Sequence, residues 1–227
     1  MEKETFVISL GGSLIIPNEL DIEFLKSFKE LILSHVEKGK KFLIITGGGK
    51  ICRKYQDGAK TLSAPTDDDL DWIGIASLRL NAELVRVMFG NYANHNVIPD
   101  LSLDFHFEKP VLVASAYKPG QSTDYGAVLG AKKLGATKVI NLSNIDYVYD
   151  SDPRVNKDAK KFEKISWSEY RSFIPAEWNP GLSSPFDPIA SKMAEEQGVQ
   201  VFILNGNPIE NLAKCLDGED FKGTTIS

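Results

Sequence analysis

Two short apolar segments that each end in a cluster of glycines limit most strongly what this chain can fold into. Thr5–Leu10 runs into the glycines at 11–12, and Lys41–Thr46 runs into the glycines at 47–49. Short apolar runs bounded by glycine are typical of buried strands. Glycine adopts positive φ and allows close approach of a ligand, and free N–H groups at such a bend bind anions. One cluster alone is explained by a tight turn, but two in one chain favour phosphate binding.

The rest of the sequence alternates between helical and strand-like patterns. Helical spacing of apolar residues is found at 21–36, 50–62, 69–89, 123–134, 166–174, 188–197 and 209–216. Further strand-like segments are found at 97–98, 111–116, 138–142, 199–204 and 224–226, with a hairpin near 147–149. Strands separated by helices of this length indicate βαβ crossovers and a largely parallel sheet. Its ligands are expected beyond the carboxyl ends of the strands. The polar stretch 150–164 is the best candidate for an excursion or a lobe boundary.

Composition excludes several classes of partner and location. The chain has 227 residues and a formal net charge of −5, whereas a nucleic-acid or anionic-membrane partner favours a basic surface. Cys52 and Cys215 lie in no metal-ligand spacing, so two free thiols are expected. No apolar run reaches the length of a membrane span, and the N-terminus lacks the features of a signal peptide. These features predict a cytoplasmic protein.

The glycine clusters differ from the common nucleotide-binding motifs. Neither matches the P-loop G-x-x-x-x-G-K-[ST] nor the dinucleotide motif G-x-G-x-x-G, and the protein-kinase signatures are absent from the sequence. Lys50, Arg53 and Lys54 follow the second cluster at the start of a helix, where the helix dipole disfavours cations unless an anion is bound. We interpret Arg53 as a phosphate contact. For Lys54, a solvated position explains the sequence as well as a phosphate contact does.

The helix predicted at 69–89 carries unusual residues. The acidic run 67–69 and Asp71 suit the start of a helix, and capping explains at least one of these carboxylates. Gly74 inside the helix costs roughly 1 kcal/mol relative to alanine. A close approach by a ligand or by a packed neighbour would offset that cost. Arg79 and Asn81 interrupt the apolar pattern further on, and a surface position is the simpler explanation for both.

Polar residues follow the other strand-like segments, where a sheet of this kind places its site, at 118–124, 141–152 and 183–192. Thr123 and Asp124 lie near the start of a helix, where a simple cap explains them. Asp187 is equally consistent with an N-cap, and Lys192 with an ordinary solvent-exposed lysine.

Eight segments carry, in order, a resemblance that runs from Ile8 to Ile226: ISLGGSL, TGGGKICRKY, DWIGIASLRLNAELV, PGQSTDYGAVLGAKKLGA, VINLSNIDYVYDSDP, SSPFDPIASKMAEEQGV, ILNG and GTTI. Together they resemble the amino acid kinase superfamily in its nucleoside-monophosphate branch. SSPFDPIASK and GGGKICRKY are similar to the archaeal-type UMP kinases in particular. The resemblance implies one α/β domain over 1–227, a three-layer sandwich with a mostly parallel central sheet. Its first portion, about 1–135, would bind the acceptor, and 136–227 would bind ATP.

The activity implied by the resemblance is phosphorylation of UMP to UDP by direct in-line transfer from ATP, with Mg²⁺ as the cofactor that accompanies ATP. It further implies a role in pyrimidine biosynthesis and a homohexamer. The implied ATP-binding residues are Gly11, Gly12, Ser13, Asn144, Tyr149 and Asp152. The implied UMP-binding residues are Gly48, Gly49, Arg53, Asp71, Gly74 and Thr123. The implied catalytic residues are Lys192, Asp187 and Lys50, with no residue holding a metal directly. All of this requires the two glycine clusters to meet in one cleft.

Two departures from the family pattern keep alternatives open. Ser9 stands where most members have a lysine, which leaves Lys50 and Lys192 as substitutes, and Asp146-Tyr147 replaces the usual Asp-Gly. One alternative is a sibling kinase of acetylglutamate, carbamate or isopentenyl phosphate, although Arg53 and Asp71 suit a nucleotide better. The other is a non-catalytic member that binds a nucleotide or oxyanion, for which Ser9 is the best support.

Overall fold

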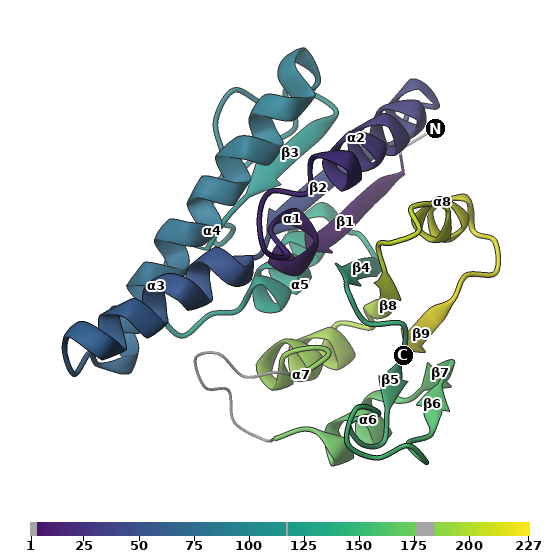
Figure 1. Ribbon diagram of the computed structural model, residues 1–227. Coiled ribbons are helices and arrows are strands. Elements are labelled where there is room, and N and C mark those ends of the chain that lie inside the picture. The colour runs from purple at the N-terminus through teal and green to yellow at the C-terminus, as the bar shows by residue number, and fades with distance from the viewer. Residues whose placement is uncertain (1–3, 117, 176–183) are drawn as a thin grey trace.

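The central feature of the protein is a seven-stranded, mostly parallel sheet (Figure 1). The computed structural model describes residues 4–116, 118–175 and 184–227, so the first serine of the SSPFDPIASK segment lies outside the described residues. The strand order is β3-β2-β1-β4-β8-β9-β7, and only β9 and β7 run against the rest. The strands are β1 Thr5–Leu10, β2 Lys41–Thr46, β3 Val111–Ala114, β4 Lys138–Ser143, β7 Lys164–Ile165, β8 Gln200–Asn205 and β9 Gly223–Ile226. The predicted parallel sheet is confirmed.

Helices cover both faces of this sheet. One face packs against α1 Gly12–Ile15, α2 Ile22–Glu37, α4 Asp67–Phe89 and α8 Glu210–Asp217, and the other against α5 Thr123–Leu134, α6 Trp167–Phe173 and α7 Pro188–Glu196. Side chains alternate between the two cores along each strand, so Phe6 and Ile8 face the first layer and Val7 faces the second. Because both faces are covered, the central strands are mainly apolar. The three-layer sandwich is therefore confirmed.

Helix α3, Gly49–Leu62, is an exception to this layering. None of its residues, all of which the structure describes, is buried, and it packs along α4 so that the pair extends past the sheet (Figure 1). A capping box starts α4: the Asp69 N–H donates to Oγ1 of Thr66 at 3.2 Å, and the Thr66 N–H donates to the Asp69 carboxylate at 2.9 Å. Capping thus accounts for part of the acidic run at 67–69, as predicted.

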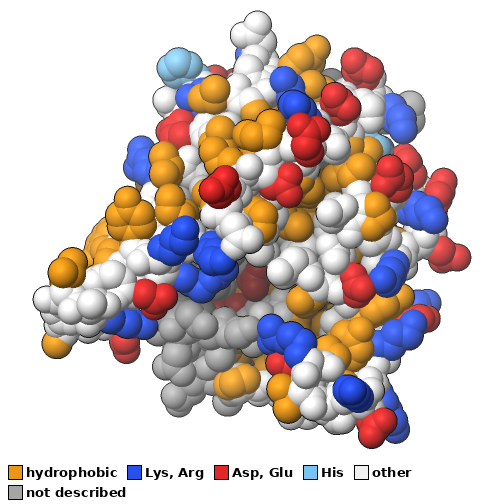
Figure 2. All heavy atoms as spheres, viewed as in Figure 1, with side chains coloured by type: hydrophobic (Ala, Val, Ile, Leu, Met, Phe, Trp, Pro, Cys, Tyr) orange, Lys and Arg blue, Asp and Glu red, His pale blue; other side chains and the backbone are white. Residues whose placement is uncertain are grey.

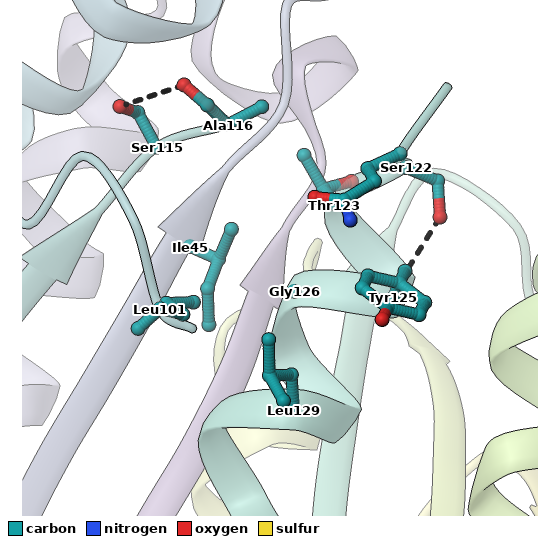
Figure 3. Close-up of a pocket in the computed structure, with 10 residues that line it drawn as sticks. Ile45, Leu101, Ser115, Ala116, Ser122, Thr123, Tyr125, Gly126 and Leu129 are labelled. Atoms are coloured by element: carbon teal, nitrogen blue, oxygen red, sulfur yellow. Dashed lines mark hydrogen bonds between the residues drawn. The ribbon is translucent and has the colours of Figure 1, made fainter. Parts of the chain in front are cut away.

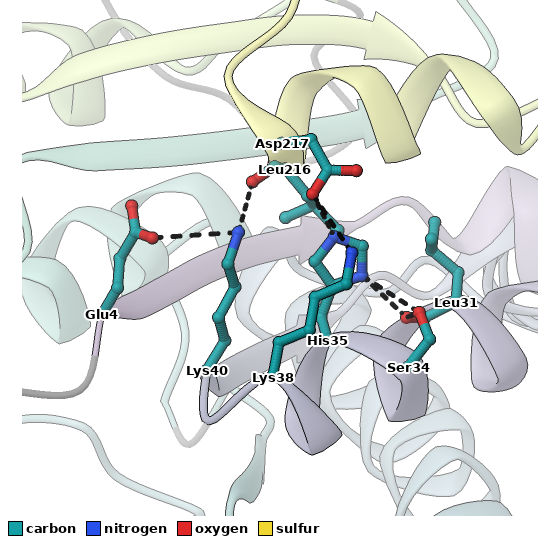
Figure 4. Close-up of polar contacts among 8 residues, drawn as sticks. All are labelled: Glu4, Leu31, Ser34, His35, Lys38, Lys40, Leu216 and Asp217. Atoms are coloured by element: carbon teal, nitrogen blue, oxygen red, sulfur yellow. Dashed lines mark hydrogen bonds and ion pairs between the residues drawn. The ribbon is translucent and has the colours of Figure 1, made fainter.

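A buried histidine ties the two ends of the chain together (Figure 4). His35 in α2 is 1% exposed, and its Nε2 lies 3.2 Å from Oδ1 of Asp217 at the end of α8. Its Nδ1 lies 3.0 Å from the carbonyl oxygen of Leu31. Lys40 Nζ donates to the carbonyl oxygen of Leu216 at 2.7 Å, and Lys38 together with His35 keeps the pKa of Asp217 below its usual value despite partial desolvation. These contacts join the helices that cover the first face of the sheet.

The polar stretch after β4 forms an excursion from the sheet. Its ends pair as a short antiparallel hairpin of β5 Val148–Tyr149 and β6 Lys161–Phe162, as expected near 147–149. The N–H of Val148 donates to Oγ1 of Thr224 at 2.8 Å, which fastens the hairpin to β9.

A few elements differ from the sequence-based prediction. Residues 97–98 form no extended strand in the described chain; Ile98 makes a single bridge to Ala114, after the short 3₁₀ turn Gly90–Tyr92. Helix α1 and strand β7 are too short for their periodicity to be recognised. Cys52 and Cys215 are free, as expected. Among the helices that the structure describes, none has the length and apolar character needed to span a bilayer.

Candidate active site

The turns that follow β1 and β2 touch each other at one edge of the sheet. The two strands are parallel neighbours with Leu10 opposite Thr46, so both turns leave the sheet at the same end. A Cβ built on Gly12 would lie 2.1 Å from the backbone N of Gly49, and one on Gly49 would lie 2.3 Å from the carbonyl oxygen of Gly12. Gly49 also has a φ of +67°, which other residues rarely adopt. The predicted meeting of the two glycine clusters is confirmed.

Helix α4 holds the second turn in place through a buried asparagine. The side-chain amide of Asn81 donates to the carbonyl oxygens of Gly47 at 2.8 Å and Gly48 at 3.3 Å, and Thr46 Oγ1 donates to the Leu78 carbonyl at 3.0 Å. Asn81 is 1% exposed, so the prediction of a surface position for it was wrong. The signal was available, because Asn81 continues the buried stripe of α4 at helical spacing from Gly74. Arg79 is exposed as predicted.

Basic side chains lie beside the second glycine turn. Arg53 and Lys54 are exposed on the first turns of α3, and Figure 2 shows blue side chains gathered where α3 begins. Lys50 is less exposed and its Nζ donates to the side-chain oxygen of Asn18, in the loop after α1. This arrangement supplies positive charge next to the free backbone N–H groups of the turn.

Asp71 links α4 to the loop that precedes α5. The Gly120 N–H donates to Oδ2 of Asp71 at 2.8 Å. Burial raises the pKa of Asp71, whereas this hydrogen bond opposes the rise. Ser122 is the N-cap of α5, since its hydroxyl accepts from the Tyr125 N–H at 3.0 Å. Thr123 and Asp124 therefore do not cap this helix, and the explanation of both as a simple cap was wrong.

A small cleft opens beside this loop, between the carboxyl ends of β2 and β3 and the start of α5 (Figure 3). Ile45, Leu101 and Leu129 form apolar walls. The hydroxyl-bearing side chains at its mouth are those of Ser115, Ser122, Thr123 and Tyr125, with Gln121 beside them. Thr123 therefore lies in a cleft that adjoins the glycine turns through β2.

Gly74 is buried where α4 faces α3. A Cβ built on it would lie 3.7 Å from Nε2 of Gln56 and 3.8 Å from Sγ of Cys52, which are ordinary contacts. Packing between the helices therefore leaves room for alanine. Among the described residues, no close packed neighbour explains this glycine, and close approach by a ligand stays a prediction.

A network centred on Asp124 joins α5 to the sheet and to α7. Oδ1 of Asp124 accepts from Ser9 Oγ at 3.1 Å and from Asn141 Nδ2 at 2.8 Å, and Oδ2 accepts from the Asp187 N–H at 3.1 Å. The residue keeps some solvent exposure, but its carboxyl group is enclosed by these partners. Burial raises the pKa of Asp124 to about 7, helped by the neighbouring Asp187 carboxylate and opposed by the three donors. Ser9, at the position of the usual lysine, is thus a hydrogen-bond partner of a buried carboxyl.

Asp187 and Lys192 lie on the first turns of α7. Asp187 is 4% exposed and caps the helix, since its carboxylate accepts from the Ala190 N–H at 2.7 Å. Burial raises its pKa, against hydrogen bonds from the Ala190 backbone and the Ser122 hydroxyl. Lys192 is exposed, one turn further along. The two aspartates therefore place the start of α7 beside the ends of β1 and β4.

The residues predicted to line an ATP site follow β1 and β4. Ser13 lies in α1 next to the glycine contact, Asn144 is exposed directly after β4, and Tyr149 is half-buried in β5. Asp152 is exposed in the excursion and forms an ion pair with Arg154 at 2.8 Å. The negative charge of Asp152 is thus balanced by Arg154. Asn144 lies at the carboxyl edge of the sheet.

The turn that carries Asp146-Tyr147 is held by side chains. Asp146 accepts from Asn205 Nδ2 at 2.9 Å and from Lys222 Nζ at 2.7 Å. The ring of Tyr147 meets that of Tyr149 edge to face with centroids 6.5 Å apart, and Lys161 Nζ lies 4.4 Å above the Tyr147 centroid. The replacement of the usual glycine is therefore accommodated by a packed aromatic pair.

Comparisons with known proteins agree with this arrangement. The sequence pattern of the amino acid kinase family matches residues 4–205. A uridylate kinase of Thermococcus onnurineus (strain NA1) is 31% identical over 223 residues, covering 97% of this chain and 98% of that protein. A uridylate kinase of Methanobrevibacter smithii is 31% identical over 224 residues, with the same coverage of both chains.

Solved structures are similar over the whole chain. The crystal structure of uridylate kinase from Archaeoglobus fulgidus matches with a TM-score of 0.80 and 31% identity, covering 99% of this chain and 100% of that one. UMP kinase from Ureaplasma parvum, at 20% identity and full coverage of both chains, shares the fold with a TM-score of 0.78. With its paired glycine turns, its three-layer sandwich and these full-length matches, the chain belongs to the amino acid kinase family.

Proposed function

We propose that this protein is a nucleoside monophosphate kinase that transfers the γ-phosphoryl group of ATP to UMP, giving UDP and ADP. The observation that carries the proposal is the backbone contact between Gly12 and Gly49, which sets two anion-binding turns side by side. One turn would hold the transferred phosphoryl group and the other the acceptor phosphate. The full-length similarity to proteins named uridylate kinase supports the choice of UMP.

The acceptor side is built from α3, α4 and the start of α5. Gly48 and Gly49 would bind the UMP phosphate with Arg53, whose exposed guanidinium is free to form a bidentate contact. Asp71, already anchored to Gly120, would bind the ribose next to Gly74. Thr123 would contact the acceptor from the cleft at the start of α5.

The donor side is built from the ends of β1 and β4 and the start of α7. Gly11, Gly12 and Ser13 would bind the ATP phosphates, and Asn144, Tyr149 and Asp152 would line the rest of the nucleotide site. Lys192 and Lys50 would supply the positive charge that a lysine at position 9 gives other members. Asp187 would keep the start of α7 in place.

Catalysis in such a site is mainly positioning and neutralisation of charge on the transferred group. The acceptor phosphate is already ionised, so no side chain needs to remove a proton. Backbone N–H groups of both turns and the two lysines would stabilise the equatorial oxygens during in-line transfer. Mg²⁺ would be held mainly by ATP oxygens, as is usual for this ion, and would neutralise phosphate charge. The buried carboxyl of Asp187, beside that of Asp124, offers the carboxylate oxygens that Mg²⁺ prefers as ligands.

Three further properties are proposed with the activity. The first portion of the chain, about 1–135, would bind UMP and the portion 136–227 would bind ATP. The reaction would take place in the cytoplasm as a step of pyrimidine biosynthesis. The protein would work as a homo-oligomer, for which a hexamer is the form implied by the family.

The decisive test is ADP release from Mg-ATP with a panel of UMP, CMP, AMP, GMP, acetylglutamate, carbamate and isopentenyl phosphate. We expect a strong preference for UMP. A preference for a non-nucleotide acceptor would establish a sibling kinase instead. Absence of ADP release with every acceptor, together with tight nucleotide binding, would establish the non-catalytic alternative that Ser9 suggests.

Arg53→Ala is expected to raise the KM for UMP by roughly 10- to 100-fold, because a charge-assisted hydrogen bond to phosphate contributes about 1.5–3 kcal/mol. The KM for ATP is expected to change little. Steady-state kinetics with each substrate varied in turn measures both. Lys60→Ala, which removes an exposed cation from the last turn of the same helix, is the matched control. Equal weakening of both substrates would refute the assignment of Arg53 to UMP.

Gly74→Ala is expected to stabilise the protein by up to about 1 kcal/mol and yet to raise the KM for UMP roughly tenfold. The gain follows from helix propensity, since a Cβ has room there, and the loss follows from its intrusion on the ribose. Urea unfolding and UMP kinetics measure the two effects. Gly58→Ala in α3, where a Cβ would meet no described atom within 4 Å, should show the gain alone. An unchanged KM for UMP would place the ribose elsewhere.

A further inference from the structure

The β5–β6 hairpin (Figure 1) presents two different faces, because side chains alternate along each strand. The register sets Val148 opposite Phe162. Val148 is 1% exposed, and Phe162 packs against the core that the sheet shares with α5, α6 and α7. The other face carries Tyr147, Tyr149 and Lys161, none of which is buried. Two aromatic rings and a cation therefore lie on the side of the hairpin that faces away from the core.

Tyr147 is at the centre of the contacts on this face. Its ring meets that of Tyr149 edge to face, with centroids 6.5 Å apart and an interplanar angle of 88°. Lys161 Nζ lies 4.4 Å from the Tyr147 centroid, and the same ammonium donates to Oε1 of Glu163 at 2.9 Å. Edge-to-face aromatic pairs and cations over a ring face are both attractive arrangements. Together these contacts restrict the rotation of both rings.

The backbone on either side of Tyr147 is held without help from its ring. Before it, the Asp146 carboxylate accepts from Lys222 Nζ at 2.7 Å. After it, the Val148 N–H donates to Oγ1 of Thr224 at 2.8 Å. The family pattern has a glycine in place of Tyr147, so the turn itself does not require a large side chain. The ring therefore has a use other than setting the course of the chain.

The aromatic face lies within reach of the first glycine turn. The Gly11 N–H donates to the carbonyl oxygen of Leu142 at 2.7 Å, so the turn after β1 is fastened to the end of β4. Tyr147 follows Leu142 by five residues, which span at most about 18 Å when fully extended. A nucleoside triphosphate with its phosphates at that turn is long enough to bring its base to the hairpin. Aromatic side chains beyond the strand ends suit a base, because every base has a π-face.

We propose that Tyr147 is a positioning residue for ATP, whose ring holds the Tyr149 ring in the orientation that packs against the nucleoside of the donor. The inference rests on the proposed function, from which it takes the ATP site. A ring that is already fixed loses less freedom when the nucleotide binds, so affinity is gained without a new contact. The role is particular to this chain, since a glycine has no ring to supply it.

Binding of a non-hydrolysable ATP analogue, measured by titration calorimetry without UMP, tests the role of the ring. Tyr147→Leu keeps an apolar side chain but removes the ring, so its Kd is expected to rise about three- to tenfold. Tyr147→Phe keeps the ring and is expected to bind as the wild type does. Tyr92→Leu is the matched control, because Tyr92 is 45% exposed beside the amino end of β3. Equal affinity of Tyr147→Leu and the wild type would overturn the inference.

Steady-state kinetics separates positioning from a purely structural role. Tyr147→Leu is expected to raise the KM for ATP by a similar factor, while kcat, the KM for UMP and the melting temperature stay close to those of the wild type. If the KM values of both substrates and the melting temperature changed together, Tyr147 would only support the fold. Equal weakening by Tyr147→Phe and Tyr147→Leu would assign the effect to the hydroxyl group and refute the role of the ring.

A double-mutant cycle tests whether Tyr147 acts through Tyr149. In the Tyr149→Leu background, Tyr147→Leu is expected to have little further effect on the Kd of the analogue, whereas additive effects would contradict the proposal. The wild type separates this inference from the kinase activity. Binding of the analogue without ADP release for any acceptor would refute the activity alone, and the variants would still decide the role of Tyr147. Absence of analogue binding would refute both.

Discussion

Gly12→Ala is expected to destabilise the protein by about 3 kcal/mol, at the upper end of the usual cost of overpacking, and to lower kcat/KM for UMP at least about 100-fold. The atoms that its Cβ would meet are all backbone: N and Cα of Gly49 at 2.1 and 2.6 Å, and the carbonyl carbon of Gly47 at 2.7 Å. A side-chain neighbour could rotate away, but these atoms belong to the second turn itself. The two turns must therefore separate, which misplaces one phosphate relative to the other.

Chemical denaturation and steady-state kinetics together check this expectation. Gly58→Ala is the comparison for stability, since it adds the same methyl group to an open position in a helix and should gain up to about 1 kcal/mol. If Gly12→Ala kept full activity and stability, the contact between the turns would be irrelevant to the fold and to the proposed site.

Asp124→Ala is expected to cost about 3 kcal/mol of stability, because three donors lose their acceptor and each unsatisfied buried group costs about 1–3 kcal/mol. The donors are the Ser9 hydroxyl, the Asn141 amide and the Asp187 N–H. Loss of the last one frees the start of α7, so kcat is expected to fall roughly tenfold or more. Asp146→Ala is the control: it also removes two hydrogen bonds, but from a side chain that is 39% exposed, and should cost under about 1 kcal/mol.

The pH dependence of stability isolates the protonation of Asp124. Its pKa is about 7 in the folded protein, above its value of 3.8 in the unfolded chain. The folded state therefore binds the proton more tightly, and the resulting stability is complete below the unfolded pKa and is lost as pH rises through 7. Relative to Asp124→Asn, the free energy of unfolding of the wild type should fall by about 1 kcal/mol between pH 6 and pH 8. A flat difference would show that the carboxyl is ionised throughout this range.

The fold could be predicted because its signals are local. Each central strand is a mainly apolar run that ends near glycine or a polar residue, and each long helix has one apolar stripe. The weak points were segments whose structure depends on a distant partner. Residues 97–98 form only the isolated bridge from Ile98 to Ala114, and β7 exists because β9 lies beside it. No local pattern carries that information.

The candidate site was predictable in part for the same reason. Backbone chemistry is visible in the sequence, so the glycine turns after β1 and β2 were found and their meeting followed from a parallel sheet. Asn81 and Asp124 were explained by simpler roles, because their partners lie 17 residues or more away along the chain. Polar residues at buried positions of a helix are the signal that would have identified both. The site roles of Arg53, Gly74 and Lys192 stay predictions.

The contact between Gly12 and Gly49 also limits how this protein can move. Main-chain atoms of the two turns are in contact, so the turns cannot move any closer to each other. Any closure around the substrates must then come from parts attached less firmly to the sheet. Helix α3, with no buried residue anywhere along its fully described length, is the segment best suited to swing while the junction stays rigid.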